Sequence, residues 1–310
     1  MKRYCLYLFI LIGISCSAEL KAQKNGTVYK GNDPAVRYTG RTLVSLDGSV
    51  AFDWVGTYLE TRFTGGKLSV KVSETGTSYY NVFVDGKLHK VVKVCGTDTL
   101  IHLVSGIDKR IHSLKIQKRS EGEFGKTTVH QFVLSGSGRL AEEPAVRTRH
   151  IEFIGNSLTC GYGTDGKHRD EPFLVETENC NLTFASMVAR YYDADYTLIA
   201  HSGRGAARNY GDSVRVSKVT MKDRMLNTFD EDLTHKWNFK EYRPDLVVIN
   251  LGSNDFSTEP HPYKSEFTKA YKQILAQLRE HYGDIPILCI YPVAMQAPVF
   301  LSLIHISEPT

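Results

Sequence analysis

The pattern of apolar and polar positions divides the chain into two parts with different periods. In the first part the period is two, as in Leu68–Val72, where apolar and polar side chains alternate. Tyr80–Val84 and Lys87–Val94 flank Asp85-Gly86, a pair that accepts the positive φ angles of a tight hairpin turn. No stretch here has a helical stripe. We therefore expect an all-β jelly roll or sandwich over residues 27–146.

The second part, residues 147–300, alternates strand and helix patterns. Apolar residues recur at helical spacing in Phe184–Tyr191 and again in Phe267–Leu278, the latter between Pro262 and Gly283. Four short apolar runs are typical of buried parallel strands: His150–Ile154, Tyr196–Ala200, Asp245–Leu251 and Ile285–Tyr291. This order predicts a three-layer α/β domain with a parallel sheet.

Length and composition fit a folded protein of two domains. The chain has 310 residues, of which 42% are hydrophobic and 23% charged. Its net charge of +4 is small, and no dense block of Lys and Arg is present. We therefore expect neither nucleic acid nor an anionic membrane surface as a partner.

The N-terminus resembles an export signal. Lys2 and Arg3 precede a mostly apolar run, Tyr4–Ile14, which is too short to span a bilayer. We expect residues 1–22 to be a signal peptide, with cleavage after Ala18 or Ala22, and the protein to be secreted, periplasmic or on the cell surface. Alternatively, Gly13-Ile14-Ser15-Cys16 is a loose lipoprotein box, and Cys16 becomes a lipid anchor. We expect no membrane span.

Four cysteines follow the predicted signal: Cys95, Cys160, Cys180 and Cys289. In an oxidising compartment, Cys160 and Cys180 could form a disulfide. The alternative is that all four are buried free thiols, and the sequence does not decide between the two.

Three polar turns follow predicted strands: Gly155–Thr159, Ser202–Gly205 and Gly252–Asp255. Reactive groups in open α/β sheets gather beyond the carboxyl ends of the strands. Ser157 could expose its hydroxyl there, at a helix start, and glycines let backbone N–H groups approach a ligand. An Asn side chain can donate to an oxyanion. Each turn alone is an ordinary turn, but together they supply one hydroxyl and three donors.

These turns resemble the first three sequence blocks of the SGNH (GDSL-type) hydrolase superfamily. The longer segments Ser157–Gly163, Ser202–Asp212 and Ile249–Ser257 are similar to carbohydrate esterase family two. That family has an N-terminal β-sandwich, to which Trp54-Val55-Gly56 is similar. The resemblance covers roughly residues 38–300.

The resemblance implies a function and its residues. Ser157 would be the nucleophile, and the oxyanion hole would be the N–H groups of Ser157 and Gly203 with the side chain of Asn254. The family hydrolyses O-acetyl esters on xylan, mannan or glucomannan, so the implied partner is an acetylated polysaccharide or oligosaccharide. No metal or organic cofactor is implied. Asn156 departs mildly from the family, since Asp is usual there. The alternatives are a non-catalytic glycan-binding protein and a lipid or aryl esterase.

The catalytic histidine is the serious departure. The superfamily takes its base from a late Asp-x-x-His block, because a serine hydroxyl needs an adjacent imidazole to accept its proton. Beyond Asp255 only His261, His281 and His305 remain, and none has Asp three positions earlier. A strand and a helix should also follow Tyr291. We therefore expect a C-terminally incomplete domain, a non-native tail at residues 301–310 and an inactive chain; should it be active, the base would be sought first at His201 and His261.

Overall fold

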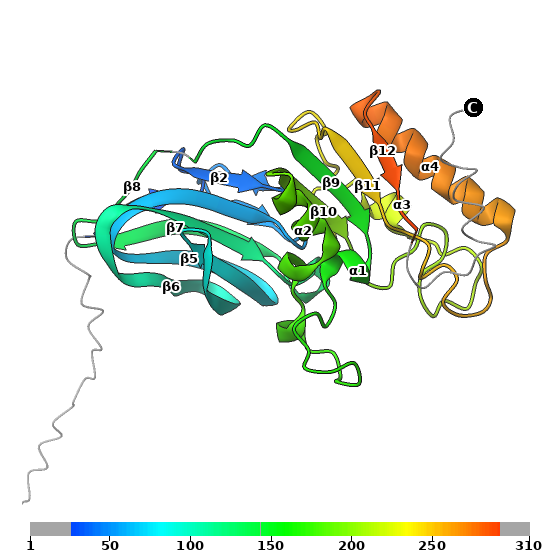
Figure 1. Ribbon diagram of the computed structural model, residues 1–310, viewed down its shortest axis with the longest axis horizontal. Coiled ribbons are helices and arrows are strands. Elements are labelled where there is room, and N and C mark those ends of the chain that lie inside the picture. Colours follow the sequence, from blue (N-terminus) through cyan, green and yellow to red (C-terminus); the bar gives the residue numbers. More distant parts are fainter. Residues whose placement is uncertain (1–25, 143, 292–310) are drawn as a thin grey trace, which may run out of the picture.

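The computed structural model describes residues 26–142 and 144–291 (Figure 1). The predicted signal peptide, Cys16, His305 and the predicted tail at 301–310 lie outside the described residues. The stretch after Tyr291, where we expect a final strand and helix to be missing, also lies outside them. All of these remain predictions.

The first part of the chain forms one antiparallel sheet of eight strands, as the period of two predicts. The strand order is β2-β5-β7-β4-β3, while β1 pairs with β7 and both β6 and β8 pair with β5. The strands are β1 (Gly26–Lys30), β2 (Val36–Thr39), β3 (Leu43–Val44), β4 (Val50–Phe52), β5 (Tyr58–Val84), β6 (Lys87–Lys118), β7 (Thr127–Ser135) and β8 (Arg139–Leu140). A single helical turn, η1 (Gly122–Phe124), separates β6 from β7.

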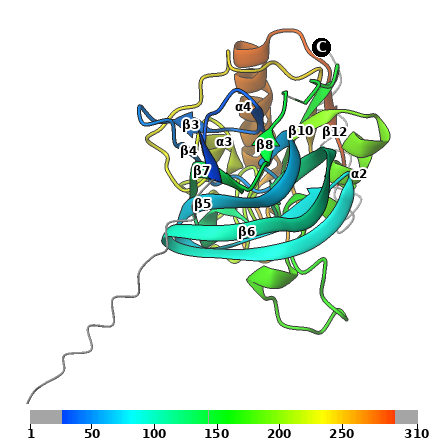
Figure 2. The ribbon, with the colours of Figure 1, turned by 90° about the vertical axis from the view of Figure 1, so that its left-hand side faces the viewer.

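Strands β5 and β6 are long and curve around this part (Figure 2). As a result, one stretch of β5 pairs with two different stretches of β6. Residues 80–84 of β5 pair with residues 87–92 on one side and with residues 114–118 on the other. Asp85 and Gly86 have φ angles of 49° and 75°, so the predicted hairpin turn is confirmed. The enclosed core contains Phe63, Leu68 and Phe132, all fully buried. Each such side chain contributes about 1.5–3 kcal/mol relative to exposure.

The second part forms a parallel sheet of four strands in the order β10-β9-β11-β12. Its strands are β9 (His150–Gly155), β10 (Asp195–Ala200), β11 (Leu246–Ile249) and β12 (Ile287–Cys289). Its helices are α1 (Ser157–Cys160), η2 (Val175–Thr177), η3 (Cys180–Leu182), α2 (Phe184–Tyr191), α3 (Met221–Arg224) and α4 (Lys264–Tyr282). All four predicted strands are present. Strands β11 and β12 are shorter than expected, because β11 pairs with β9 and β12 only over Leu246–Ile249, and β12 pairs with β11 only over Ile287–Cys289.

The parallel sheet carries a separate apolar cluster on each face. Ile154 and Val247 pack with α3 and α4, whereas Phe153 and Leu198 pack with α2 and with Val55 of the β part. Figure 1 shows α4 and α2 on opposite sides of the sheet, with α2 on the side of the β part. Both faces are therefore covered, as the continuous apolar runs of the strands predict.

Both tryptophans of the chain lie where the two parts meet. Trp54, between β4 and β5, is fully buried in the core of the parallel sheet, and its indole N–H donates to the Asn227 carbonyl at 3.4 Å. Trp237, from the α/β part, lies under the guanidinium of Arg41, which the β part contributes. The join is thus a packed interface rather than a flexible linker.

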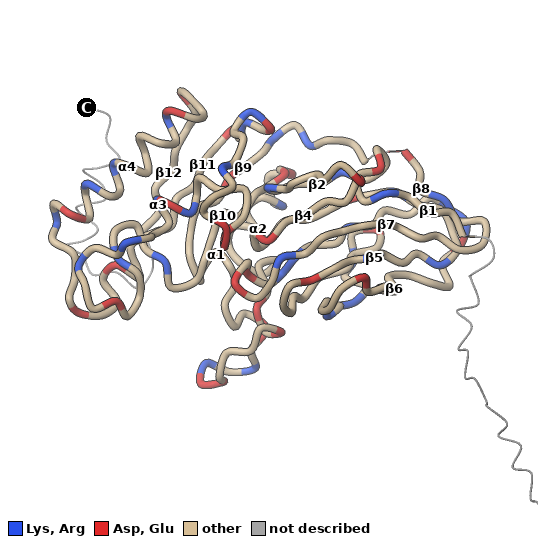
Figure 3. The backbone as a smooth tube through the Cα atoms, turned by 180° about the vertical axis from the view of Figure 1, so that it is seen from behind, with Lys and Arg blue, Asp and Glu red and all other residues tan. Residues whose placement is uncertain are grey.

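The four cysteines within residues 26–142 and 144–291 are free thiols. Cys160 and Cys180 are buried and form no disulfide, so the pairing alternative is wrong. The other alternative holds for these two residues only, because Cys95 is exposed and Cys289 half-buried. Among the helices that the structure describes, none has the length and apolar character needed to cross a bilayer. Figure 3 shows basic and acidic residues interspersed over both parts.

Candidate active site

Ser157 lies at the first position of α1, directly after β9. Asn156 precedes it with a non-helical φ of −136°, and its side chain accepts a hydrogen bond from the Leu158 N–H. This is the N-cap arrangement that satisfies a free donor at a helix start. Gly161, with φ of 86°, ends the helix after one turn. The backbone N–H of Ser157 has no acceptor within residues 26–142 and 144–291 and is available to a ligand.

Gly203 lies in the turn that follows β10, and its φ of 73° favours glycine. Its N–H also has no acceptor in the described part of the chain. Gly205, two residues on, is required for space: an added Cβ would lie 2.0 Å from the Arg208 carbonyl oxygen and 2.4 Å from Asp255 Oδ2.

Asn254 and Asp255 follow β11, and their side chains form hydrogen bonds with the backbone of the turn that contains Gly203. Asn254 Nδ2 donates to the Arg204 carbonyl at 2.8 Å and keeps a second hydrogen for a ligand. The fully buried Asp255 carboxylate accepts the N–H groups of Ala206, Ala207 and Arg208 at 3.0, 2.6 and 2.9 Å. Burial raises the pKa of Asp255, and these three hydrogen bonds oppose that shift. The aspartate is therefore a structural anchor of the turn.

Hydrogen bonds join the three turns to one another. Asn156 Nδ2 donates to Ser253 Oγ at 2.9 Å, and the His201 N–H donates to the Gly155 carbonyl at 3.4 Å. With the bond from Asn254 to Arg204, every pair of turns is linked. The structure therefore brings Ser157, Gly203 and Asn254 to one edge of the sheet, as the sequence predicts. One hydroxyl and three free N–H donors suit the tetrahedral intermediate of an acyl transfer.

No histidine within the described ranges is hydrogen-bonded to the Ser157 hydroxyl. His201 directly follows β10, next to the Gly203 turn, but its ring faces carboxylates: Nδ1 lies 2.7 Å from Asp230 and Nε2 lies 3.5 Å from Glu123. Burial alone would lower the pKa of His201, but Asp230, Glu123 and Glu121 outweigh it and raise that pKa to about 10. At neutral pH the ring is an imidazolium, which cannot accept a proton from serine.

The two later histidines in the described ranges have partners of their own. His261 is partly exposed, next to Glu259 at 3.4 Å, and His281 is exposed and stacks on Phe239 with ring centroids 3.9 Å apart. Within the described part of the chain, neither forms a hydrogen bond with Ser157.

Sequence reasoning missed the residues that the β part contributes to this edge. Glu121, just after β6, accepts the Ser202 N–H at 2.5 Å. Asp53 accepts the N–H groups of Asp230 and Glu231 at 2.8 and 3.2 Å. No local pattern marks such residues, because their partners lie 81 and more positions away in the chain.

Two side-chain groups have a metal-like arrangement: Glu121 with Cys160 and Glu178, and His201 with Asp230 and Glu231. In the second group, Arg224 already pairs with both carboxylates, at 2.9 and 2.7 Å. In the first group, the Glu121 carboxylate is already used by Ser202. Both groups are thus built as hydrogen-bond and ion-pair clusters.

Comparison with known proteins identifies the family. The model of the carbohydrate esterase 2 N-terminal domain matches residues 38–144, and that of the GDSL-like lipase/acylhydrolase family matches residues 153–303. The solved structure of a family two carbohydrate esterase from Clostridium thermocellum, in complex with cellohexaose, is similar with a TM-score of 0.82 and 32% identity. The match covers 87% of this chain and 83% of that one.

The chain belongs to carbohydrate esterase family two.

Two curated relatives of this family-two chain are informative. It is 34% identical over 258 residues to the cellulase/esterase CelE of Acetivibrio thermocellus, covering 83% of this chain and 31% of that protein. It is 32% identical over 226 residues to an acetylxylan esterase / glucomannan deacetylase of Cellvibrio japonicus, covering 71% and 61%. The chain therefore spans less than two thirds of the length of either relative.

Proposed function

We propose that this family-two protein removes O-acetyl groups from plant polysaccharide such as xylan, mannan or glucomannan. One observation supports the proposal most strongly. Hydrogen bonds between the three turns place Ser157, Gly203 and Asn254 at one edge of the sheet, and each of these residues keeps an N–H donor free. The names of the relatives, an acetylxylan esterase / glucomannan deacetylase among them, supply the substrate class.

Two exposed aromatic residues favour a sugar substrate over a lipid. The Tyr162 N–H donates to the Ser157 carbonyl, and the Tyr210 N–H donates to the Gly203 carbonyl, so both residues are fixed beside the site. Their side chains are 49% and 63% exposed. Exposed aromatic rings beside an open turn suit the flat apolar faces of sugar rings better than an acyl chain, which would need an enclosed tunnel.

The reaction would proceed through an acetyl-enzyme. Ser157 Oγ attacks the acetyl carbonyl carbon, and the carbonyl oxygen becomes an oxyanion that accepts from Ser157 N–H, Gly203 N–H and Asn254 Nδ2. The bond between the acetyl carbon and the sugar oxygen breaks, and that oxygen takes the proton that Ser157 Oγ loses. Water then attacks the acetyl-enzyme, releasing acetate and restoring the Ser157 hydroxyl.

We further propose that none of the histidines within 26–142 and 144–291 is the general base. His201 is held as an imidazolium by its carboxylates, His261 pairs with Glu259, and His281 stacks on Phe239. Without a base the hydroxyl stays protonated near neutral pH. We expect that His305, which has no Asp three positions before it, is not the base either, so the 310-residue chain should turn over acetyl esters close to the background rate.

Acetate release from acetylated xylan and glucomannan, together with hydrolysis of 4-nitrophenyl acetate, tests both proposals. The 310-residue chain is compared with a version completed by the C-terminal segment of a family relative, each with and without Ser157→Ala. We expect turnover in the completed version alone and none after Ser157→Ala. Turnover that survives Ser157→Ala would refute the nucleophile. Equal turnover of the two versions would refute the statement about the base, and His261 and His305 would be replaced next.

Glycan binding without catalysis is the second candidate, favoured by the exposed tyrosines and by the placement of the described histidines. Calorimetric titration with cellohexaose and with xylan oligosaccharides decides between the two functions. Micromolar binding by a completed version that releases no acetate would support the binding function.

We also propose that the protein is exported. The basic start and the apolar run Tyr4–Ile14 support this. Mass spectrometry of the exported protein should show loss of residues up to Ala18 or Ala22, or a diacylglyceryl adduct on Cys16. An intact Met1 would refute export by this signal.

A further inference from the structure

Glu121 is a carboxylate from the β part that reaches the turn holding Gly203. It lies three residues after the end of β6 and is fully buried. One oxygen accepts the backbone N–H of Ser202 at 2.5 Å, and the other accepts the Ser202 hydroxyl. Both donors of the residue before Gly203 are therefore fixed by one side chain from the other part of the chain.

The Gly203 N–H lies in the peptide plane between Ser202 and Gly203, so the conformation of Ser202 sets its direction. Packing does not hold this plane: a Cβ added to Gly203 would meet nothing nearer than the Cβ of Tyr210, at 3.9 Å. Glycine is also the most flexible residue, so the plane needs anchors on both sides. On the far side Asn254 holds the Arg204 carbonyl, and on the near side Glu121 holds Ser202.

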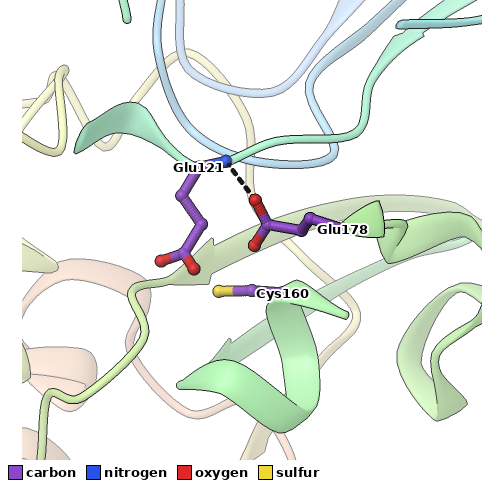
Figure 4. A group of neighbouring side chains, drawn as sticks. All are labelled: Glu121, Cys160 and Glu178. Carbon is purple, nitrogen blue, oxygen red and sulfur yellow. Dashed lines mark hydrogen bonds between the residues drawn. The ribbon is translucent and has the colours of Figure 1, made fainter. Parts of the chain in front are cut away.

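Glu121 is itself fixed by the loop that follows the nucleophile helix (Figure 4). Its backbone N–H donates to Glu178 Oε2 at 3.0 Å, and the ligand atoms of Glu121, Glu178 and Cys160 lie within 4.8 Å of one another. Figure 4 shows the Cys160 sulfur directed at the two carboxyl groups. Cys160 is the last residue of α1, the helix that begins with Ser157. Glu121 therefore touches both the nucleophile helix and the Gly203 turn.

Glu178 is a second buried carboxyl group beside Glu121. Burial and the neighbouring Glu121 raise the pKa of Glu178 well above its ordinary value. The two carboxyl groups and Cys160 thus form one buried cluster that ties the β part to the loop after α1.

We propose that Glu121 is a positioning residue of the oxyanion hole, by which the β part sets the direction of the Gly203 N–H. The proposal rests on the proposed esterase function for its catalytic consequence. It makes the β part a component of the catalytic apparatus and not only a neighbouring domain.

Three substitutions of Glu121 separate the effect of side-chain length from the effect of charge. Glu121→Gln keeps the length and one acceptor oxygen for the Ser202 N–H. Glu121→Asp keeps the charge but is one methylene too short, and Glu121→Ala removes both. Glu74→Gln is the matched control: Glu74 is also a buried carboxylate of the β part, bonded to the Thr127 hydroxyl at 2.5 Å and not to the α/β part.

Amide hydrogen exchange in the full 310-residue chain measures directly how firmly the backbone around Ser202 is held. A peptide covering residues 200–205 should exchange about tenfold faster, or more, in the Ala and Asp variants, the factor implied by loss of one buried hydrogen bond. Its rate should be close to wild type in Glu121→Gln and Glu74→Gln. Unchanged exchange in all four would overturn the proposal, and so would rescue by Asp but not by Gln.

Hydrolysis of 4-nitrophenyl acetate measures the catalytic consequence, in the version that carries the C-terminal segment of a family relative. In the Ala and Asp variants kcat should fall about 10- to 100-fold with KM nearly unchanged, since outright removal of an oxyanion donor costs about 100- to 1000-fold. Glu74→Gln should leave kcat unchanged, and a wild-type kcat in both variants would overturn the proposal. If that version does not exceed its Ser157→Ala variant, the proposed esterase function fails, and the exchange rates alone decide the role of Glu121.

Discussion

The two parts of the molecule meet at both ends of the parallel sheet, and the two contacts are built differently. At the amino ends of the strands, Arg37 and Arg147 pair with Glu60 and Asp195, two cations with two anions. At the carboxyl ends, the β part contributes Asp53, Glu121 and Glu123, whose partners are backbone N–H groups, the Ser202 hydroxyl and the ring of His201.

The difference indicates what each contact controls. A balanced group of long, charged side chains attracts from many geometries and so stabilises docking without fixing any peptide plane. A carboxylate that accepts a backbone N–H fixes the direction of that peptide. We therefore expect changes at the amino end to alter stability and changes at the carboxyl end to alter turnover.

The largest effect should come from Asn254→Ala, measured in a version that turns over acetyl esters. Loss of one oxyanion donor should lower kcat about a hundredfold, or about 3 kcal/mol in the transition state. KM should change little, because the charge exists only in the transition state. A change in KM alone would mean that Asn254 binds the substrate in its ground state.

At the amino end, Asp195→Asn should lower the free energy of unfolding and leave kcat nearly unchanged. Asp195 accepts from Arg37, Arg147 and the Tyr58 hydroxyl, at 2.6, 2.8 and 2.7 Å. Breaking a buried pair costs about 3–5 kcal/mol, and Arg147 is partly exposed, so we expect a loss of about 2 kcal/mol in the free energy of unfolding. Denaturant unfolding measures it. A fall in kcat without a loss of stability would break the distinction between the two ends.

Acid should weaken the amino end. Burial opposes ionisation of Asp195, but Arg37, Tyr58 and Arg147 outweigh it and lower its pKa to about 2. The unfolded value is about 3.9, so the contribution of Asp195 is present above about pH 4 and is lost as pH falls toward 2. Unfolding free energies at several acidic pH values should show this slope in the wild type and a smaller one in Asp195→Asn.

Base should weaken the carboxyl end, with the smallest effect near neutrality. The pKa of His201 is raised to about 10, above the unfolded value of about 6.5. Its contribution is therefore present below about pH 6.5 and is lost as pH rises toward 10. His201→Gln should flatten the decline of the unfolding free energy over that range. An unaltered decline would show that His201 is not the titrating group.

The sequence predicts the secondary structure well because the buried faces impose strong periods. Strand alternation in the β part and continuous apolar runs in the α/β part depend on which faces are buried, and both survive in the structure. The hairpin at Asp85-Gly86 is also local, since the turn residues themselves dictate its φ angles.

The site is predictable only where its chemistry is local. Ser157, Gly203 and Asn254 follow strands that end at one edge, so the fold rule places them together. Glu121 and the ion pairs of His201 depend on contacts between segments far apart in the chain, and nothing near them in sequence marks a partner. The Cys160–Cys180 alternative fails for the same reason: spacing along the chain does not set the distance between two thiols.

The placement of the two tryptophans has an optical consequence. Trp54 and Trp237 are the only indoles in the chain, and both lie at the junction between the β part and the α/β part. Intrinsic fluorescence excited at the indole band therefore reports the environment of that junction and neither of the two hydrophobic cores alone. A red shift of the emission would signal separation of the two parts even while both sheets, followed by circular dichroism, stayed folded.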